Sequence, residues 1–195
     1  MAGRWIVVGA GSGGCVAAAR LADDPDNEVV LLEHGPGLPP GAVPAELASS
    51  DFTAALAAPG RTHDDLTASR AEGDEQPYPQ GRGVGGSSAI NAMIALRGDP
   101  GRYEAWGWQD VAAAWDRIEL PEERPDRDEL GPVNRALLDA VSDAAIAPLT
   151  RRHGRRVTAA EAYLWPRWER AGLEVRPETA VRRLCVDGRR AVGVE

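Results

Sequence analysis

The sequence predicts an α/β fold with a parallel sheet, built around a βαβ unit at the amino end of the chain. Two observations carry this prediction. Four apolar residues, 5–8, lead directly into a glycine turn and a small-residue helical pattern that continues to Leu21. A second apolar run, residues 28–32, follows and ends in the acidic residue Glu33. Strand, turn, helix and strand in this order place two parallel strands side by side.

The turn after the first strand has the spacing G-x-G-x-x-G. Gly9 permits a sharp turn, Gly11 opens the backbone to close approach by a ligand, and Gly14 lets the helix pack against the strand. The helix N-terminus then offers free N–H groups to an anion. Glu33 lies about 20 residues further on, where an acid that hydrogen-bonds ribose hydroxyls is expected. The pattern predicts a dinucleotide site; the alternative is an ordinary βαβ unit with a glycine turn.

Composition limits the class of protein. The chain of 195 residues suffices for one domain with a full core, or for part of a larger one. Its net charge is −8 and all 22 basic side chains are arginine, which argues against nucleic acid or an anionic membrane as the main partner. No apolar run approaches the length of a membrane span, and glycines interrupt the first apolar stretch. We therefore expect a cytoplasmic protein without a transmembrane segment.

The two cysteines, Cys15 and Cys185, have no metal-ligand spacing, so the sequence predicts neither a metal site nor a redox role for them. We expect Cys15 to pack against the sheet as a small apolar residue. Cys185 falls in a stretch that reads as a strand.

A second glycine-rich segment begins at Gly81 and carries four glycines in six positions, followed by two serines and a helix-compatible run. Glycines let the backbone approach a ligand closely, and Ser87 or Ser88 is expected to cap the helix and donate hydroxyl hydrogen bonds. Asn91 lies one helical turn further on and is expected to face the same ligand. The alternative is a flexible glycine hinge. Two such loops in one chain favour a large flavin dinucleotide over a simple NAD unit.

Between and after these loops the sequence predicts irregular and helical segments. Residues 36–44 form a loop rich in Pro and Gly, residues 45–56 a short helix, and residues 61–79 a polar surface excursion. The pattern over residues 110–119 predicts a capped helix with one apolar face. A further helix is predicted to begin at Pro132.

The carboxy-terminal part predicts a helix followed by strands. Residues 158–161 form a capping box, which starts the helix. Residues 173–176 and 179–186 both read as strands. Asp187-Gly188 is a hairpin turn signal, and residues 190–195 form the return strand.

The stretch 81–104 resembles the first signature of the glucose-methanol-choline (GMC) flavoprotein oxidoreductases. The matching residues are Gly81, Arg82, Val84, Gly85, Gly86, Ser87, Ser88, Ile90, Asn91, Ala95, Gly98 and Glu104. The amino-terminal glycines and Glu33 resemble the FAD site of the same family, and residues 101–108 resemble a shortened form of the segment after the signature. The resemblance covers most of the chain.

The resemblance implies a Rossmann-like FAD-binding domain, here partial, with the βαβ unit, the second glycine-rich loop and a carboxy-terminal β-hairpin. Residues 1–195 would be an incomplete GMC-type domain, in which residues 99–157 form a mainly helical excursion at the start of the substrate side. The implied cofactor-binding residues are Gly9, Gly11, Ser12, Gly13, Gly14, Glu33, Arg82, Val84, Gly85, Gly86, Ser87, Asn91, Ala92, Met93, Ile94 and, through its backbone to the adenine, Val181. Some members attach the flavin through a histidine where Ile90 and Asn91 stand here, which implies non-covalent FAD.

The implied activity is oxidation of an alcohol, which loses a proton to a base and a hydride to the flavin, with a separate electron acceptor. The family's base is a histidine in the carboxy-terminal part of a longer chain. None of His34, His63 and His153 lies in a motif that resembles that segment. We therefore assign no catalytic residue and expect the chain alone to turn over alcohols negligibly. A catalytically silent dinucleotide-binding fragment and an NAD-dependent Rossmann enzyme remain as alternatives.

Overall fold

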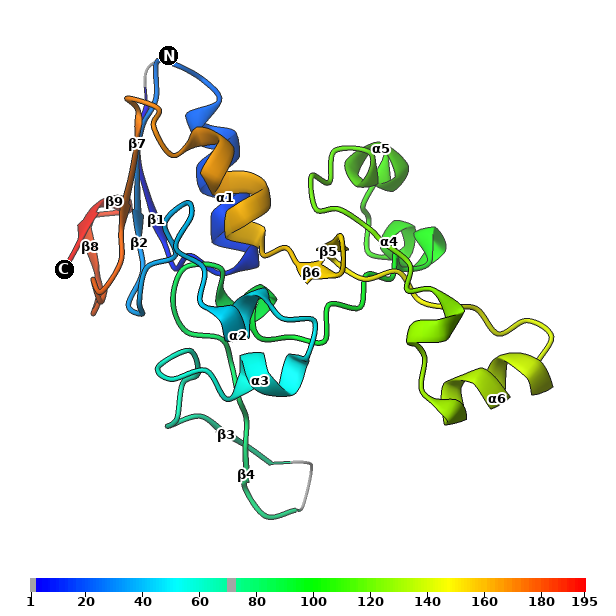
Figure 1. The fold of residues 1–195 in the computed structure, drawn as a ribbon. Coiled ribbons are helices and arrows are strands. Elements are labelled where there is room, and N and C mark those ends of the chain that lie inside the picture. Colours follow the sequence, from blue (N-terminus) through cyan, green and yellow to red (C-terminus); the bar gives the residue numbers. More distant parts are fainter. Residues whose placement is uncertain (1–2, 70–72) are drawn as a thin grey trace.

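The structure is a computed structural model that describes residues 3–69 and 73–195, and it contains a three-stranded parallel sheet at one side of the molecule (Figure 1). Its strands are β1 (Arg4–Val8), β2 (Glu28–Leu32) and β7 (Leu173–Arg176), in the order β1-β2-β7. At the carboxyl ends of the strands, Val8 pairs with Leu32, which also pairs with Arg176. The predicted βαβ unit is therefore confirmed, and so is the strand over residues 173–176.

One face of the sheet is covered by two helical segments (Figure 1). Helix α1 (Ser12–Ala22) connects β1 to β2, and a π-helical segment (Ala160–Leu164) followed by a 3₁₀ turn (Trp165–Arg167) packs beside it. Alternate residues of β2 point into the same core, where Val29 and Leu31 are buried. The buried residues of α1 have small side chains, which let the helix lie close to the sheet; they are Cys15, Ala18, Ala19 and Ala22.

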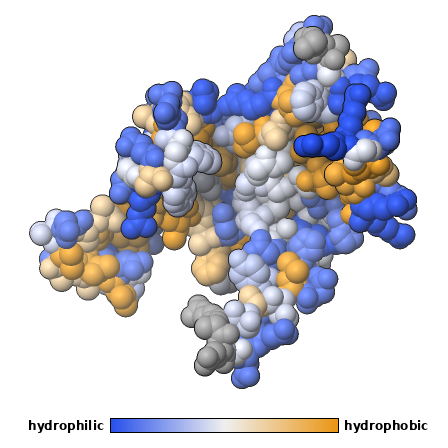
Figure 2. Space-filling model, turned by 180° about the vertical axis from the view of Figure 1, so that it is seen from behind, coloured by the Kyte–Doolittle hydropathy of each residue, from blue (hydrophilic) through white to orange (hydrophobic). Residues whose placement is uncertain are grey.

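The opposite face of β1 remains open. Val7 packs against the core, so its neighbours Ile6 and Val8 point to the other face, where they are 48% and 55% exposed. Figure 2, seen from behind, shows hydrophobic surface on the side where the sheet and the hairpin of β8 (Leu184–Asp187) and β9 (Arg190–Val194) lie. Parallel sheets ordinarily have both faces covered. This face of β1 is therefore an apolar surface on which further structure can pack.

The remaining elements are short. Between β2 and the second glycine loop lie α2 (Ala45–Ala48), α3 (Phe52–Leu56), β3 (Thr67–Ala68) and β4 (Gln76–Pro77). Residues 99–157 contain α4 (Pro100–Ala105), α5 (Val111–Trp115), a 3₁₀ turn (Arg127–Glu129), α6 (Pro132–Ala140), β5 (Arg151–Arg152) and β6 (Arg155–Arg156). Figure 1 shows α4, α5 and α6 extending away from the sheet, joined by irregular chain. In the part of the chain that the structure describes, no helix has the length and apolar character needed to cross a membrane.

The helix predicted over residues 45–56 is two helices. Ser49 at the end of α2 has an extended backbone, with ψ of 147°, which interrupts the helical hydrogen bonds. Asp51 then starts α3 anew, because its side chain accepts a hydrogen bond from the N–H of Thr53 at 2.9 Å.

The helix predicted over residues 110–119 ends at Trp115 and is not capped by a side chain. Asp110 has a left-handed backbone with φ of 57°, and its carboxylate makes no capping hydrogen bond. The helix predicted from Pro132 is confirmed and ends at Ala140.

The strand predicted over residues 179–186 begins only at Leu184. Glu178 has a left-handed backbone, with φ of 54°, and the N–H of Thr179 donates to the Glu33 carbonyl at 2.8 Å. This segment therefore turns back toward the end of β2 before the hairpin begins. The hairpin itself is confirmed, with Gly188 in the left-handed region at its turn.

The predicted surface excursion over residues 61–79 is only partly correct; its residues 70–72 lie outside the described residues. Arg61 is buried, and its guanidinium donates to the carbonyls of Pro36 and Gly37 at 3.3 and 2.9 Å. Burial lowers the pKa of Arg61. An arginine at the edge of a polar segment gives no local sign that distant carbonyls will enclose it.

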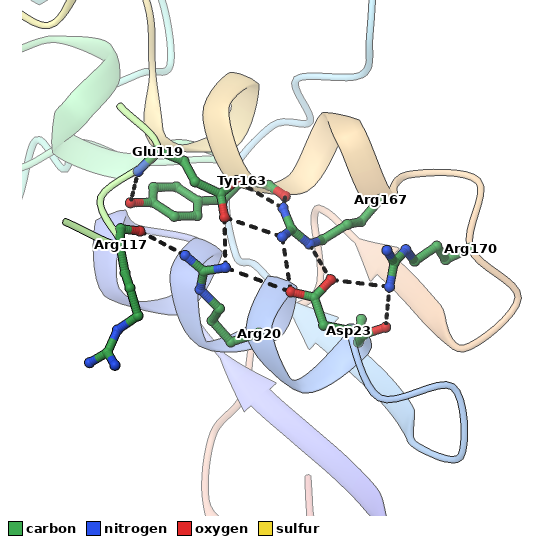
Figure 3. Close-up of polar contacts among 8 residues, drawn as sticks. Arg20, Asp23, Arg117, Glu119, Tyr163, Arg167 and Arg170 are labelled. Carbon is green, nitrogen blue, oxygen red and sulfur yellow. Dashed lines mark hydrogen bonds and ion pairs between the residues drawn. The ribbon is translucent and has the colours of Figure 1, made fainter. Parts of the chain in front are cut away.

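An ion-pair cluster joins three parts of the chain (Figure 3). They are α1, the helical segment beside it, and residue 119 in the segment 99–157. Arg167 donates to both carboxylate oxygens of Asp23, at 2.8 and 2.9 Å, and to both of Glu119, at 3.1 and 3.2 Å. Arg20 pairs with Glu119 at 2.7 Å, and the Tyr163 hydroxyl accepts the Glu119 N–H. The hydrogen bonds from Arg167 hold the pKa of Asp23 below its usual value. The cluster therefore holds residue 119, which follows α5, against α1.

We expect Arg167→Met to lower the free energy of unfolding at pH 7 by about 2 kcal/mol, because two carboxylates lose their shared partner. The loss is smaller than for a fully buried pair, since about a third of each carboxylate side chain stays in contact with water. Asp23 has a lowered folded-state pKa, so its stabilising contribution is complete above its unfolded pKa and disappears as the pH falls toward the folded value. The difference between variant and wild type should therefore shrink at pH 3.

Urea unfolding at pH 7 and pH 3 measures both effects. Arg4→Met is the control, because it removes the exposed ion pair with Glu28 and is expected to cost about 0.5 kcal/mol at most. An equal loss for Arg167→Met at the two pH values would contradict the prediction.

Candidate cofactor site

The first glycine turn has the predicted geometry. Gly9 has φ of 89°, and its N–H donates to the Leu32 carbonyl at 2.7 Å. A β-carbon at Gly14 would lie 1.8 Å from the Gly9 carbonyl oxygen, so only glycine lets α1 start this close to β1. A β-carbon at Gly11 would meet no atom within 4 Å. The chain itself leaves open the space at Gly11, where the predicted ligand needs it.

The N-terminus of α1 faces this open space without a side-chain cap. Gly11 is the N-cap residue and supplies no side-chain hydrogen bond, and Ser12 and Gly13 are exposed. The first N–H groups of a helix have no intrahelical partner, and they carry partial positive charge. An eleven-residue helix with an uncapped glycine N-terminus therefore fits a diphosphate.

The carboxylate of Glu33 is buried, with 7% of the residue exposed, and accepts three backbone N–H groups. Oε2 accepts from Ala10 at 2.7 Å, and Oε1 accepts from Gly35 at 2.7 Å and Gly83 at 3.0 Å. A carboxylate offers about four acceptor positions. Glu33 thus joins both glycine loops to the end of β2, and one acceptor position on Oε2 remains for the predicted ribose hydroxyl.

The second glycine loop packs directly against the first. The N–H of Gly85 donates to the Ala10 carbonyl at 2.8 Å, and a β-carbon at Gly86 would lie 2.5 Å from the Gly11 Cα. Val84 is fully buried, and its N–H donates to the Pro36 carbonyl. The structure therefore brings together two loops that are far apart in the sequence, as a common dinucleotide site requires.

The serines of this loop do not cap a helix. Gly85 has a left-handed backbone and precedes a single 3₁₀ turn (Gly86–Ala89). No side chain of the described residues caps that turn. The Ser87 hydroxyl oxygen accepts the Gly81 N–H, while the Ser88 hydroxyl donates to the Gly85 carbonyl and accepts the Ala159 N–H. Both hydroxyls therefore hold the loop in shape.

The helix predicted after the serines does not continue beyond that turn. The side chain of Asn91 accepts the N–H of Met93, which has φ of 61°, and this bond ends the helical path. Ile94 then forms a bridge with Leu149, and the Met93 carbonyl accepts the Thr150 N–H. Asn91, Ala92 and Ile94 are exposed, whereas Met93 is buried.

Two further predicted residues lie around the Glu33 end of the site. The Arg82 guanidinium donates to the carbonyls of Gly60 and His34, which follows Glu33. Val181 lies two residues after Thr179, whose N–H bonds to the Glu33 carbonyl. The contact of Val181 with an adenine stays a prediction, as do the other ligand contacts of the predicted residues.

Sequence reasoning missed Arg156. Its side chain is fully buried, and Nη1 donates to the Asn91 carbonyl at 2.7 Å and to Asn91 Oδ1 at 3.1 Å. Four arginines lie within residues 151–156, and no local pattern separates the buried ones, Arg151 and Arg156, from the exposed ones.

The Cys15 prediction is confirmed. Its side chain is buried, the thiol donates to the Ala10 carbonyl at 3.1 Å, and burial raises its pKa to about 12. A thiol with this pKa is protonated at neutral pH, so Cys15 is a packing residue beneath the glycine turn.

The parallel βαβ unit, the two touching glycine loops and the buried acid define a dinucleotide-binding α/β domain. A family model described as GMC oxidoreductase matches residues 4–147, which is most of the chain, and the chain belongs to this family. It corresponds to the FAD-binding part of the GMC oxidoreductases.

Three comparisons illustrate the relationship. Human mitochondrial choline dehydrogenase is 33% identical over 98% of this chain, and the alcohol dehydrogenase [acceptor] of Pseudomonas putida is 28% identical over 97%. The crystal structure of pyridoxine 4-oxidase from Mesorbium loti superposes with a TM-score of 0.85 at 28% identity over the whole chain. The chain spans 39%, 41% and 45% of the lengths of these three proteins.

Proposed function

We propose that this chain binds FAD non-covalently and forms the flavin-holding part of a cytoplasmic enzyme that oxidises the CH–OH group of a small alcohol. The observation that carries the proposal is the contact of the two glycine loops around Gly11 and Gly86, in front of the uncapped N-terminus of α1. Bound FAD would supply a hydride acceptor for the alcohol carbon, and a separate acceptor would take up the electrons. The family relationship favours FAD over the NAD alternative.

Each part of the site has a role in this proposal. The N–H groups at residues 11–14 hold the diphosphate, and Glu33 fixes the adenosine ribose through its remaining acceptor position. The N–H groups of Glu178 and Thr179 donate to the carbonyls of Gly35 and Glu33, and these bonds support the assignment of the nearby Val181 to the adenine. The segment 91–94, in which Asn91, Ala92 and Ile94 are exposed, contacts residues 149–150 and is assigned to the flavin ring at the other end of the second loop.

The chain's histidines receive no catalytic role. The rings of His34 and His63 lie 6.3 Å apart, at the Glu33 end of the site, which the proposal assigns to the adenosine. His153 lies in the turn between β5 and β6, where its N–H donates to Glu123. The substrate alcohols of the relatives differ, so the proposal extends to a small alcohol and to no particular compound.

Titration of the purified protein with FAD, and identification of any small molecule released on denaturation, test the proposal. We expect FAD binding in the wild type and at least a 100-fold weaker affinity in Gly11→Val, because the added side chain occupies the space of the diphosphate. Stability should change by less than about 1 kcal/mol, since, apart from the chain neighbours, no atom of the described residues lies within 4 Å of that β-carbon.

Gly131→Val is the matched control, because its β-carbon also meets nothing within 4 Å and Gly131 lies outside the site. Release of NAD without flavin, or unchanged FAD affinity in Gly11→Val, would refute the assignment. Turnover of alcohols with an artificial electron acceptor then separates an enzyme from a catalytically silent dinucleotide-binding fragment.

A further inference from the structure

Arg156 is a buried cation with two nitrogens that have no acceptor. Among the described residues, the hydrogen bonds of the Arg156 side chain all start from Nη1. This nitrogen donates to the carbonyl and Oδ1 of Asn91 and, at 3.4 Å, to the Ser88 carbonyl. Nε and Nη2 are buried and have no hydrogen-bond partner among the described residues. Buried donors are nearly always paired, so two unpaired N–H groups on one charged side chain require a physical reason.

The charge of Arg156 has no ion-pair partner among the described residues. Glu161, the acid that acts on it electrostatically, pairs with Arg155 at 2.6 Å and accepts the Thr158 N–H. Arg151 is also buried, but it pairs with both Glu123 and Glu129.

Burial lowers the pKa of Arg156, yet a guanidinium is not deprotonated in proteins, so the positive charge persists at neutral pH. In surroundings of low dielectric constant such a charge acts over a longer range and more strongly than it would in water. Arg156 therefore gives one end of the second glycine loop a fixed positive potential.

The end of the loop at Ser88 and Asn91 is the one furthest from Glu33, the residue predicted to bind the ribose. Glu33 contacts the loop at Gly83, the first glycine turn contacts it at Gly85 and Gly86, and Arg156 contacts it at Ser88 and Asn91. On this order of contacts, a dinucleotide with its ribose at Glu33 and its diphosphate at Gly11 would extend its second base toward Asn91. In FAD that base is the flavin ring.

We propose that Arg156 is a positioning residue that holds the segment 88–91 and supplies a positive charge without an ion-pair partner to the flavin end of the site, favouring reduced over oxidised flavin. This inference rests on the proposed FAD binding. Flavin reduced by two electrons carries a negative charge on its ring near neutral pH, and a nearby cation therefore stabilises the reduced form more than the neutral oxidised form.

The test compares the dissociation constants of oxidised FAD and dithionite-reduced FAD, measured without oxygen on the purified protein. We expect the wild type to bind reduced FAD at least tenfold more tightly, which corresponds to about 30 mV in the two-electron potential. Arg156→Met should remove this preference, and Arg156→Lys should keep most of it. Arg152→Met is the control, because it removes a neighbouring arginine whose side chain is exposed, and it should retain the preference.

The outcomes separate the two proposals. A wild type that binds neither form of FAD refutes the proposed function and this inference together. A wild type that binds both forms equally refutes the role of Arg156 and leaves FAD binding standing, and this comparison needs no variant to fold. If Arg156→Met weakens both forms by the same factor, the side chain is only structural and the inference is wrong.

Discussion

Glu33→Ala is expected to lower the free energy of unfolding by about 4 kcal/mol, although the sequence motif predicts only a ligand contact for this residue. The N–H groups of Ala10, Gly35 and Gly83 would lose their acceptor in a buried site. Each unsatisfied buried donor costs about 1–3 kcal/mol, and water entering the space left by the side chain offsets part of the sum. FAD affinity should also fall, about tenfold or more, because one further acceptor is lost.

Urea unfolding of the ligand-free protein measures the change in the free energy of unfolding separately from the change in FAD affinity. The control is Glu28→Ala, at the other end of β2, whose exposed carboxylate pairs with Arg4 and should contribute less than about 0.5 kcal/mol. A loss below about 1 kcal/mol for Glu33→Ala would mean that water satisfies the three donors. A normal FAD affinity in a folded variant would place the ribose acid elsewhere.

Gly14→Ala is expected to lower the free energy of unfolding by about 3 kcal/mol, since the new methyl group would lie 1.8 Å from the Gly9 carbonyl oxygen. Both atoms belong to rigid backbone, so α1 must shift away from β1 to make room. That shift would separate the helix N-terminus from the glycine turn, and FAD affinity should fall with stability.

Gly13→Ala is the matched control one residue earlier in α1. Its β-carbon would meet nothing within 4 Å, and its backbone is helical, so alanine there should leave stability unchanged or raise it by up to about 1 kcal/mol. If thermal or urea unfolding shows the same stability for both variants, the close contact of Gly14 with Gly9 is not what fixes the helix.

The sequence alone determined the elements whose causes are local. The apolar runs and the glycine spacing specify β1, α1 and β2, because strand periodicity and the special conformations of glycine act within a few residues. The capping box is confirmed for the same reason, with the Thr158 hydroxyl accepting the Glu161 N–H and the Glu161 carboxylate accepting the Thr158 N–H. The turn at Gly188 is likewise fixed by its own φ preference.

Only the tertiary structure decided how these elements meet. The carboxylate of Glu33 accepts N–H groups from three separate segments, and no sequence motif records such a meeting. The run after Ser88 is compatible with a helix, yet it becomes extended because Asn91 bonds to Met93 and residues 93–95 pair with residues 148–150. Arg156 is buried for a similar reason, since carbonyl oxygens 65 and 68 residues away accept its hydrogen bonds. Local propensity fixes short elements, whereas long-range hydrogen bonds and burial fix the shape of the site.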